Sequence, residues 1–243
     1  MMISPYGLRE VLIYGVGVPL LGVGASGALV EWQGYPALWA ICAPFVLVGM
    51  FTLYFFRDPS RTPPGDEFTV VSPADGVVTD VGEREEGEYL KGKVQSIGIF
   101  LSVFDVHVNR APLAGEVEYL RHQDGAYHDA RSEEASTLNE AQNIGVKSDL
   151  GPRFTLRQIT GLVARRIVCP LKKGSAFQRG ERIGMLKFGS RTELYLAPEF
   201  EVEWLVTVGD KVRGAKTAIA RVRVVETATV AAQAAESAAG ERD

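Results

Sequence analysis

A glycine-serine pair near the C-terminal end offers the most direct chemistry in this chain. Gly189 and Ser190 follow Ile183–Phe188, a run with the composition of a β-strand. If a strained turn holds this peptide, the serine Oγ attacks the preceding carbonyl to give an ester, which eliminates and hydrolyses to a pyruvoyl group. A bare Gly-Ser pair is a common turn dipeptide, so the neighbouring residues must support this interpretation. The other pair, Gly174-Ser175, follows two lysines and is expected in a surface loop.

The residues around Ser190 carry a family resemblance. Ile183–Ser190, followed by Arg191–Leu196, closely resembles the self-cleavage segment of the short, membrane-associated, pyruvoyl-dependent phosphatidylserine decarboxylases. Other stretches resemble the same family in the same order: Phe55–Pro59, Ser72–Gly76, Phe104–Pro112 and, more loosely, Asn139–Asn143. The similarity covers roughly residues 50 to 225.

The resemblance implies a self-made cofactor and a defined reaction. Cleavage between Gly189 and Ser190 would leave a large chain, 1–189, and a small chain, 190–243, that begins with a pyruvoyl group made from Ser190. That group forms a Schiff base with the substrate amine, and its adjacent carbonyl accepts the electrons left when CO2 departs. Phosphatidylserine supplies the amine and the carboxylate, so the expected product is phosphatidylethanolamine.

The resemblance also places Asp75 and His107 at the site. A histidine near its working pH can take a proton from a serine or return one to Cα. We assign His107 to protonation of the intermediate, and Asp75 to orienting a partner or assisting cleavage. Without that context, the histidine reads as a structural residue of an apolar strand and the aspartate as an Asx-turn residue before Gly76.

One position departs from the pattern of the longer family members. They have a second histidine three residues beyond the first, where this chain has Arg110, and arginine cannot act as an ordinary base. The base for cleavage therefore stays open among His107, Asp75 and the strained backbone. Arg110 is expected to hold the substrate phosphate or carboxylate. His128 is a further candidate for the pocket.

Metal chemistry has little support in the sequence. The three histidines and the two cysteines, Cys42 and Cys169, do not form a metal-binding constellation, so no metal is expected. The cysteines are not expected to form a disulfide, because Cys42 lies in the second apolar span and Cys169 in the soluble part. Both are predicted to be reduced packing residues.

The first 58 residues are predicted to form a membrane hairpin. Val11–Val30 and Ala37–Phe56 contain no charged residue, and each has about the 20 residues that cross a ~30 Å hydrocarbon core. Arg9 precedes the first span, Arg57 follows the second, and the connector is acidic, which places the following domain on the cytoplasmic side of the cell membrane. The alternative is a pair of buried core helices, because prolines and glycines weaken both spans.

Residues 59–225 are predicted to form a β-rich catalytic domain resembling a barrel-sandwich hybrid, with Gly189 and Ser190 on a turn between strands. The one expected helix is Ser132–Ala141, and the tail 226–243 is expected to be disordered. The predicted strands are Thr69–Ser72, Gly76–Val81, Val94–Ser102, Val106–Arg110, Gly115–Arg121, Arg153–Thr160, Ile167–Pro170, Gly184–Phe188, Glu193–Ala197, Glu201–Val206 and Thr217–Val225.

The uneven distribution of charge along the chain indicates a membrane surface as a partner. The chain carries a net charge of −4, yet Pro152–Arg191 holds ten Lys or Arg against one acidic residue. Such a group suits anionic lipid, whereas an acidic chain without interleaved aromatic and basic residues does not suit nucleic acid. Any single one of these basic residues could equally lie on the solvated face of a strand.

Two other functions stay open. The same reaction on another serine lipid, such as an archaetidylserine-like ether lipid, fits because the sequence specifies the headgroup chemistry better than the tails. A non-catalytic, membrane-tethered barrel-sandwich adaptor is the alternative from another class, with Lys211 in a turn as its weak carrier residue. A homo-oligomer is expected for the enzyme.

Overall fold

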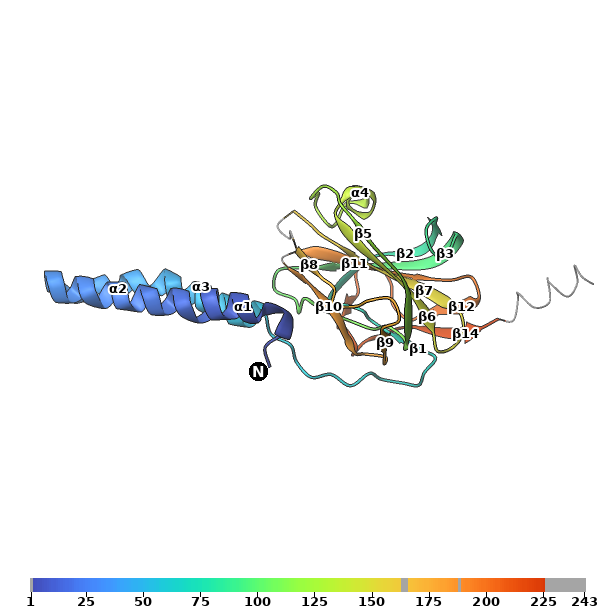
Figure 1. The fold of residues 1–243 in the computed structure, drawn as a ribbon, viewed down its shortest axis with the longest axis horizontal. Coiled ribbons are helices and arrows are strands. Elements are labelled where there is room, and N and C mark those ends of the chain that lie inside the picture. The colour runs from blue at the N-terminus through green and yellow to red at the C-terminus, as the bar shows by residue number, and fades with distance from the viewer. Residues whose placement is uncertain (1, 163–165, 188, 226–243) are drawn as a thin grey trace, which may run out of the picture.

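The computed structural model describes residues 2–162, 166–187 and 189–225, and it has two parts. An apolar helical hairpin extends as a rod from one end of a β domain, and the last strand leaves at the opposite end (Figure 1). The prediction of a mainly β domain behind an apolar helical hairpin is confirmed. The tail that was predicted to be disordered lies outside the described residues.

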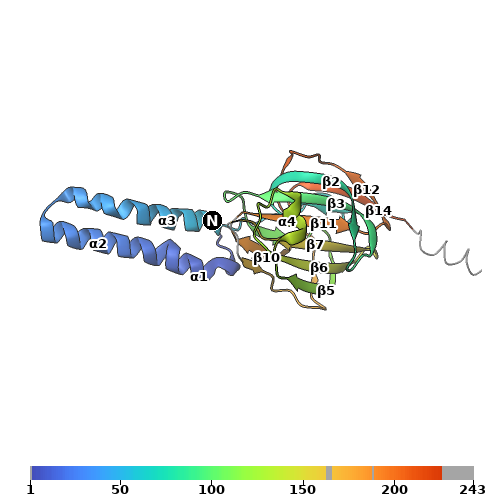
Figure 2. The same cartoon turned by 90° about the horizontal axis from the view of Figure 1, so that it is seen from above.

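The hairpin has two antiparallel arms (Figure 2). The first arm contains a 3-10 turn η1 (Pro5–Gly7), α1 (Leu8–Glu10), a π-helical stretch η2 (Val11–Gly17) and α2 (Val18–Gln33); the second contains a 3-10 turn η3 (Pro36–Ile41) and α3 (Cys42–Phe55). The π-helical stretch lies just before Pro19, whose ring and missing N–H disturb the regular α-helical bonding of the preceding turn.

Small residues let the two arms pack closely. A Cβ atom on Gly22 would lie 2.5 Å from the Phe45 side chain, and one on Gly49 would lie 2.4 Å from Pro19. The glycines and prolines that weaken these helices in isolation therefore form the contact between them.

Most of the hairpin surface is apolar and exposed. Both arms are long and apolar enough to cross a membrane, and only 22% and 17% of their most apolar windows are buried. A core helix of a soluble protein buries most of its apolar face, so this exposure disagrees with the alternative of two core helices. Large patches of this kind mark membrane or protein contacts.

The β domain consists of three antiparallel sheets. Their orders are β13-β2-β3-β11-β7-β6-β5-β9, β1-β14-β12 and β4-β10-β8. A short helix, α4 (Glu133–Leu138), precedes β6. The strands are β1 (Thr69–Val71), β2 (Gly76–Glu86), β3 (Gly92–Leu101), β4 (Val108–Arg110), β5 (Gly115–Gln123), β6 (Ala141–Ser148), β7 (Arg153–Ile159), β8 (Arg166–Val168), β9 (Ala176–Phe177), β10 (Arg182–Lys187), β11 (Ser190–Leu196), β12 (Phe200–Trp204), β13 (Lys211–Val212) and β14 (Ala218–Val224).

Each predicted strand overlaps an observed one, but three strands were missed. The most important is β6, whose polar and glycine residues hide the apolar alternation of a strand. Pairing with β5 on one side and β7 on the other stabilises it, and the Tyr89 ring covers Gly145, where an added Cβ would lie 2.6 Å from the ring. The predicted helix Ser132–Ala141 is correspondingly shorter, because Ala141 already belongs to the strand.

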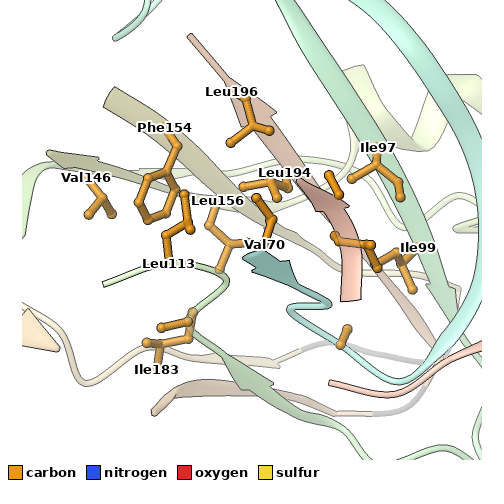
Figure 3. Packing of buried hydrophobic residues seen from close by; sticks show 14 of the residues in the cluster. Val70, Ile97, Ile99, Leu113, Val146, Phe154, Leu156, Ile183, Leu194 and Leu196 are labelled. Carbon is orange, nitrogen blue, oxygen red and sulfur yellow. The ribbon is translucent and has the colours of Figure 1, made fainter. Parts of the chain in front are cut away.

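The core lies between the sheets and is built from aliphatic residues of many strands. Ile97 and Ile99 of β3, Leu194 of β11 and Leu156 of β7 point into it, and each is at most 1% exposed (Figure 3). This packing fixes β11, the strand that begins at Ser190, against both of its neighbours.

A second, smaller core joins the foot of the hairpin to the β domain. Val11, Phe55 and Phe56 of the hairpin pack against Met185 of β10. Lys187 at the end of the same strand donates to the Glu10 carboxylate at 2.6 Å. Both arms of the hairpin therefore contact the strand that leads to Gly189.

Candidate active site

The Gly189-Ser190 peptide connects two different sheets. β10 ends at Lys187 in the three-stranded sheet β4-β10-β8, and β11 begins at Ser190 between β3 and β7 of the eight-stranded sheet. Gly189 has a φ of +60°, in the left-handed region that glycine adopts without steric cost. The prediction placed both residues on a turn between strands, but only Gly189 lies outside β11. Ser190 is the first residue of that strand, which starts three residues earlier than expected because Arg191 and Thr192 are buried strand residues.

The Ser190 side chain is fully buried and lacks a hydrogen-bond partner. Its Cα pairs with Leu101 of β3, its exposure is 0%, and its Oγ has no partner among the described residues. A buried hydroxyl without a partner costs about 1–3 kcal/mol. Most buried hydroxyls in proteins are hydrogen-bonded, so the free Oγ fits a group that is held for reaction.

His107 contacts the same peptide from the segment before β4. Its Nε2 accepts a hydrogen bond from the Gly189 N–H at 3.4 Å, and its Nδ1 lies 3.0 Å from the Asp105 carbonyl oxygen. This network assigns the proton to Nδ1 and leaves a lone pair on Nε2 facing Gly189. The imidazole also packs on the Phe55 ring of the hairpin, with centroids 4.3 Å apart.

Burial keeps this histidine neutral. Desolvation lowers the pKa of His107 to about 4, although the Asp105 carbonyl and carboxylate and the more distant Asp75 act in the opposite direction. At neutral pH the imidazole is therefore in the form that can accept a proton.

A buried polar chain lies next to Ser190 along β11. Asn109 of β4 donates to the Thr192 hydroxyl at 3.0 Å and accepts from the Gln158 amide at 2.7 Å. All three residues are 0% exposed, and Gln158 Oε1 has no partner among the described residues. Asn109 lies in a stretch that resembles the family, but Gln158 carried no signal in the sequence, because a single glutamine in a strand predicts only a polar face.

Gly161 lies against the carbonyl that Ser190 would attack. A Cβ atom at Gly161 would be 2.3 Å from the Gly189 oxygen, too close for any real contact. We expect Gly161→Ala to displace this carbonyl and to slow self-cleavage about 100-fold, the scale of a 1 Å misplacement in a reacting group. Pulse labelling during cell-free synthesis measures the rate. Gly87→Ala, where an added Cβ meets nothing, is the matched control; equal cleavage rates in both variants would contradict the expectation.

Asp75 holds a turn near the C-terminal end of the β domain. Its carboxylate accepts from Arg61, with the Nη2 contact at 2.7 Å, and from the Gly214 N–H at 2.8 Å. No described hydrogen bond joins it to His107 or Ser190. Asp75 therefore fixes the turn at Gly214, and its predicted role in orienting a partner or assisting cleavage stays a prediction.

Breaking the Asp75–Arg61 pair should be costly. Both side chains are about nine-tenths buried, so Asp75→Ala leaves an uncompensated guanidinium, which typically costs about 3–5 kcal/mol of unfolding free energy. The double variant Asp75→Ala/Arg61→Met should recover part of that loss, because no buried charge then stays unpaired. Urea unfolding of the detergent-solubilised chain measures both values, and a double variant less stable than the single one would disagree with this account.

Arg110 and His128 lie away from the cleavage pair in the described contacts. Arg110 is buried and binds Asp58 at 2.6 Å, together with the carbonyl oxygens of Pro59 and Gly180. His128 is exposed, and only its backbone bonds to Asn139: its N–H donates to the Asn139 Oδ1, and its carbonyl oxygen accepts from the Asn139 amide. Sequence reasoning did not find Asp58 as the partner of Arg110, because the two residues belong to different stretches. A substrate-binding role for either residue stays a prediction.

Most of the basic residues predicted to attract lipid have partners inside the protein. The pairs are Arg153 with Glu118, Arg157 with Gln123, Arg179 with carbonyl oxygens, Arg182 with Asp58, Lys187 with Glu10 and Arg191 with Asp80 and Glu193. An attraction between this cluster and anionic lipid stays a prediction. Among the described residues, no group of three or more His, Cys, Asp or Glu could hold a metal ion.

The fold and the site define a mainly β protein with a buried serine and a neutral histidine at the foot of an apolar helical hairpin. The model of the phosphatidylserine decarboxylase family matches residues 48–220. A phosphatidylserine decarboxylase proenzyme of Carboxydothermus hydrogenoformans is 45% identical over 215 residues, which cover 88% of this chain and 96% of that protein. One of Desulfotalea psychrophila is 38% identical over 206 residues, covering 85% and 94%. The chain therefore belongs to the phosphatidylserine decarboxylase family.

Proposed function

We propose that this protein is a self-processing decarboxylase that converts phosphatidylserine to phosphatidylethanolamine and CO2. Family membership and the proenzyme names of the relatives support the reaction and the processing. The single observation that carries the proposal is the buried, unpartnered Ser190 Oγ directly after Gly189, whose N–H donates to a histidine that is neutral at pH 7.

The residues around position 190 fit a pyruvoyl group. The group is made from atoms of Ser190 itself and needs a buried place free of competing donors, which the unpartnered hydroxyl indicates. Once formed, it supplies a carbonyl that reacts with the substrate amine and accepts the electron pair released with CO2. Thr192 follows Ser190 by two residues in β11, and Asn109 of β4 donates to its hydroxyl, so both lie near this position.

Self-cleavage requires the Ser190 Oγ to attack the Gly189 carbonyl carbon. The C–O bond forms as the peptide C–N bond breaks, giving an ester and a free amine on Ser190. Loss of the Ser190 Hα then expels the Gly189 carboxylate, and one water replaces the nitrogen, which leaves as ammonia. We assign His107 Nε2 as the base for these proton transfers, because its lone pair faces Gly189.

The same imidazole can serve the decarboxylation. After CO2 leaves, Cα needs a proton, and His107 can deliver the one that its Nε2 takes from the substrate ammonium when the amine is made ready to react. Its full burial against Phe55 excludes water from the imidazole face. A pKa of about 4 makes the protonated form a strong acid that gives its proton up readily.

We infer that the hairpin embeds the enzyme in the cell membrane with the β domain on the cytoplasmic side. The two arms have the length and apolar character of membrane helices. Basic residues lie at the open end of the hairpin and an acidic connector at its tip, which fits the positive-inside rule. The site lies at the same end as the hairpin foot, where a lipid headgroup arrives.

Product analysis tests the proposed function. The purified, detergent-solubilised chain is incubated with phosphatidylserine or with an archaeal-type serine ether lipid, and products are identified by mass spectrometry. Phosphatidylethanolamine and CO2 from the ester lipid are the expected result. Conversion of the ether lipid alone would transfer the assignment to that substrate, and no conversion of either lipid by a fully processed protein would refute the proposal.

A further inference from the structure

A large cavity lies between the hairpin foot and the β domain. Its volume is about 880 Å³, and Tyr54 and Arg57 at the end of the hairpin form part of its wall. The rest comes from residues 59–61, the residues at the start of β2, the end of β3 with the segment before His107, and β13 with the turn that follows it. The cavity therefore borders the foot of the hairpin and reaches the segment that carries His107.

The charged residues of the cavity are predominantly basic. Arg57, Lys211, Arg213 and Lys216 line it, and none of them has a carboxylate partner among the described residues. Of the two acidic residues in the wall, Asp75 is neutralised by Arg61, and the Asp105 carboxylate accepts the Ser102 N–H at 2.8 Å. Four cations around one cavity, none of them neutralised by a described carboxylate, create a site for an anion.

The cations lie on backbone that the fold holds in place. The turn 213–217 is closed by bonds from the Lys216 and Thr217 amides to the Arg213 carbonyl. Its Gly214 residue donates to Asp75. On the opposite wall the Arg57 guanidinium donates to the carbonyl oxygens of Tyr54 and Phe104 and stacks 3.8 Å from the Tyr54 ring. Preorganised cations bind an anion at a smaller entropic cost than mobile ones.

The cavity is adjacent to the reacting groups. Phe100 and Ser102 in its wall flank Leu101, whose Cα pairs with Ser190. Asp105 and Val106 in the wall precede His107 directly. In a serine phospholipid only three bonds separate the phosphorus from the serine Cα, so a phosphate held in the cavity keeps the amine and carboxylate near this wall.

We propose that this cavity binds the phosphodiester of the substrate headgroup through Arg57, Lys211, Arg213 and Lys216. The proposal rests on the proposed function, because it takes the serine phospholipid as substrate. The proposal also gives Asp75 a function, because its carboxylate accepts from Gly214 and so fixes the turn that carries two of the four cations. The hairpin foot contributes one wall, so the site is complete only where the membrane part meets the β domain.

Charge reversal on the turn tests the proposal. The full-length, self-processed protein is compared with Arg213→Glu/Lys216→Glu, using short-chain phosphatidylserine below its micellar concentration so that membrane binding does not contribute. We expect KM to rise at least tenfold with kcat within about twofold, and self-cleavage to continue. Lys172→Glu/Lys173→Glu, which reverses two neighbouring lysines outside the cavity, is the matched control and should leave KM unchanged.

Binding to uncleaved protein supplies a readout without chemistry. Calorimetry on the Ser190→Ala chain should detect glycerophosphoserine, and the turn variant should lose at least tenfold in affinity. Equal affinity for inorganic phosphate would make the cavity a free-phosphate site and overturn the headgroup assignment. If the wild type is active and the turn variant has the same KM, this proposal fails and the proposed function stands. If the wild type is inactive, the proposed function fails, and the calorimetric affinities alone decide whether the cavity binds the headgroup.

Discussion

Replacing Ser190 by alanine should leave the chain in one piece and abolish decarboxylation. The variant lacks the Oγ that attacks the Gly189 carbonyl, so neither the ester nor the new N-terminal group can form. The fold should tolerate the change, because the hydroxyl makes no hydrogen bond among the described residues that the variant would lose. Denaturing gel electrophoresis and an assay of CO2 release measure the two effects, and we expect activity at background level.

The chain offers a matched control for this variant. Ser175 follows Gly174 in the second glycine-serine pair of the sequence, and its Oγ accepts from the Lys172 amide in a loop. Ser175→Ala should cleave and react like the wild type. A Ser190→Ala chain that still separates into two fragments would place the cleavage elsewhere.

Replacing His107 by glutamine should slow self-cleavage by about 10²–10⁴-fold, the usual contribution of a positioned base. Glutamine has a similar size and can accept the Gly189 N–H, but it cannot take a proton. A time course of precursor and products in cell-free synthesis measures the rate. His128→Gln, which changes an exposed histidine, should cleave at the wild-type rate.

The pH dependence of cleavage reports on the same residue. Because burial lowers the pKa of His107 to about 4, the neutral form prevails above that value and the protonated form below it. The cleavage rate should therefore be flat between about pH 5 and pH 8 and fall about tenfold per unit below pH 4. A rate that falls already from pH 7 to pH 6 would indicate a base with an ordinary histidine pKa and contradict the environment described for this imidazole.

The sequence was sufficient for the parts of the site that short stretches encode. Gly189, Ser190 and His107 could be predicted because each lies in a stretch with a family resemblance, and the structure brings these three together. The hairpin was predictable from two spans without charge. Both signals are local in the chain, so a single sequence contains them in full.

Contacts between distant stretches could not be predicted. Arg110 pairs with Asp58, and Arg191 with Asp80 and Glu193. In the sequence these arginines look like free cations, and only the three-dimensional structure shows that carboxylates neutralise them. The reverse holds for Arg213 and Lys216, which read as an ordinary turn but line the cavity. Strand β6 was missed for a related reason, since its stability comes from two neighbouring strands and not from its own composition.

Intact-mass analysis of the purified wild-type protein is the sharpest test of self-cleavage before Ser190. We expect two chains, residues 1–189 with an ordinary carboxyl end and residues 190–243 with a ketone in place of the first amine. The small chain should resist Edman degradation and gain the expected mass with a carbonyl reagent. A single chain of 243 residues in fully active protein, or a small chain that begins with an unmodified serine, would contradict it.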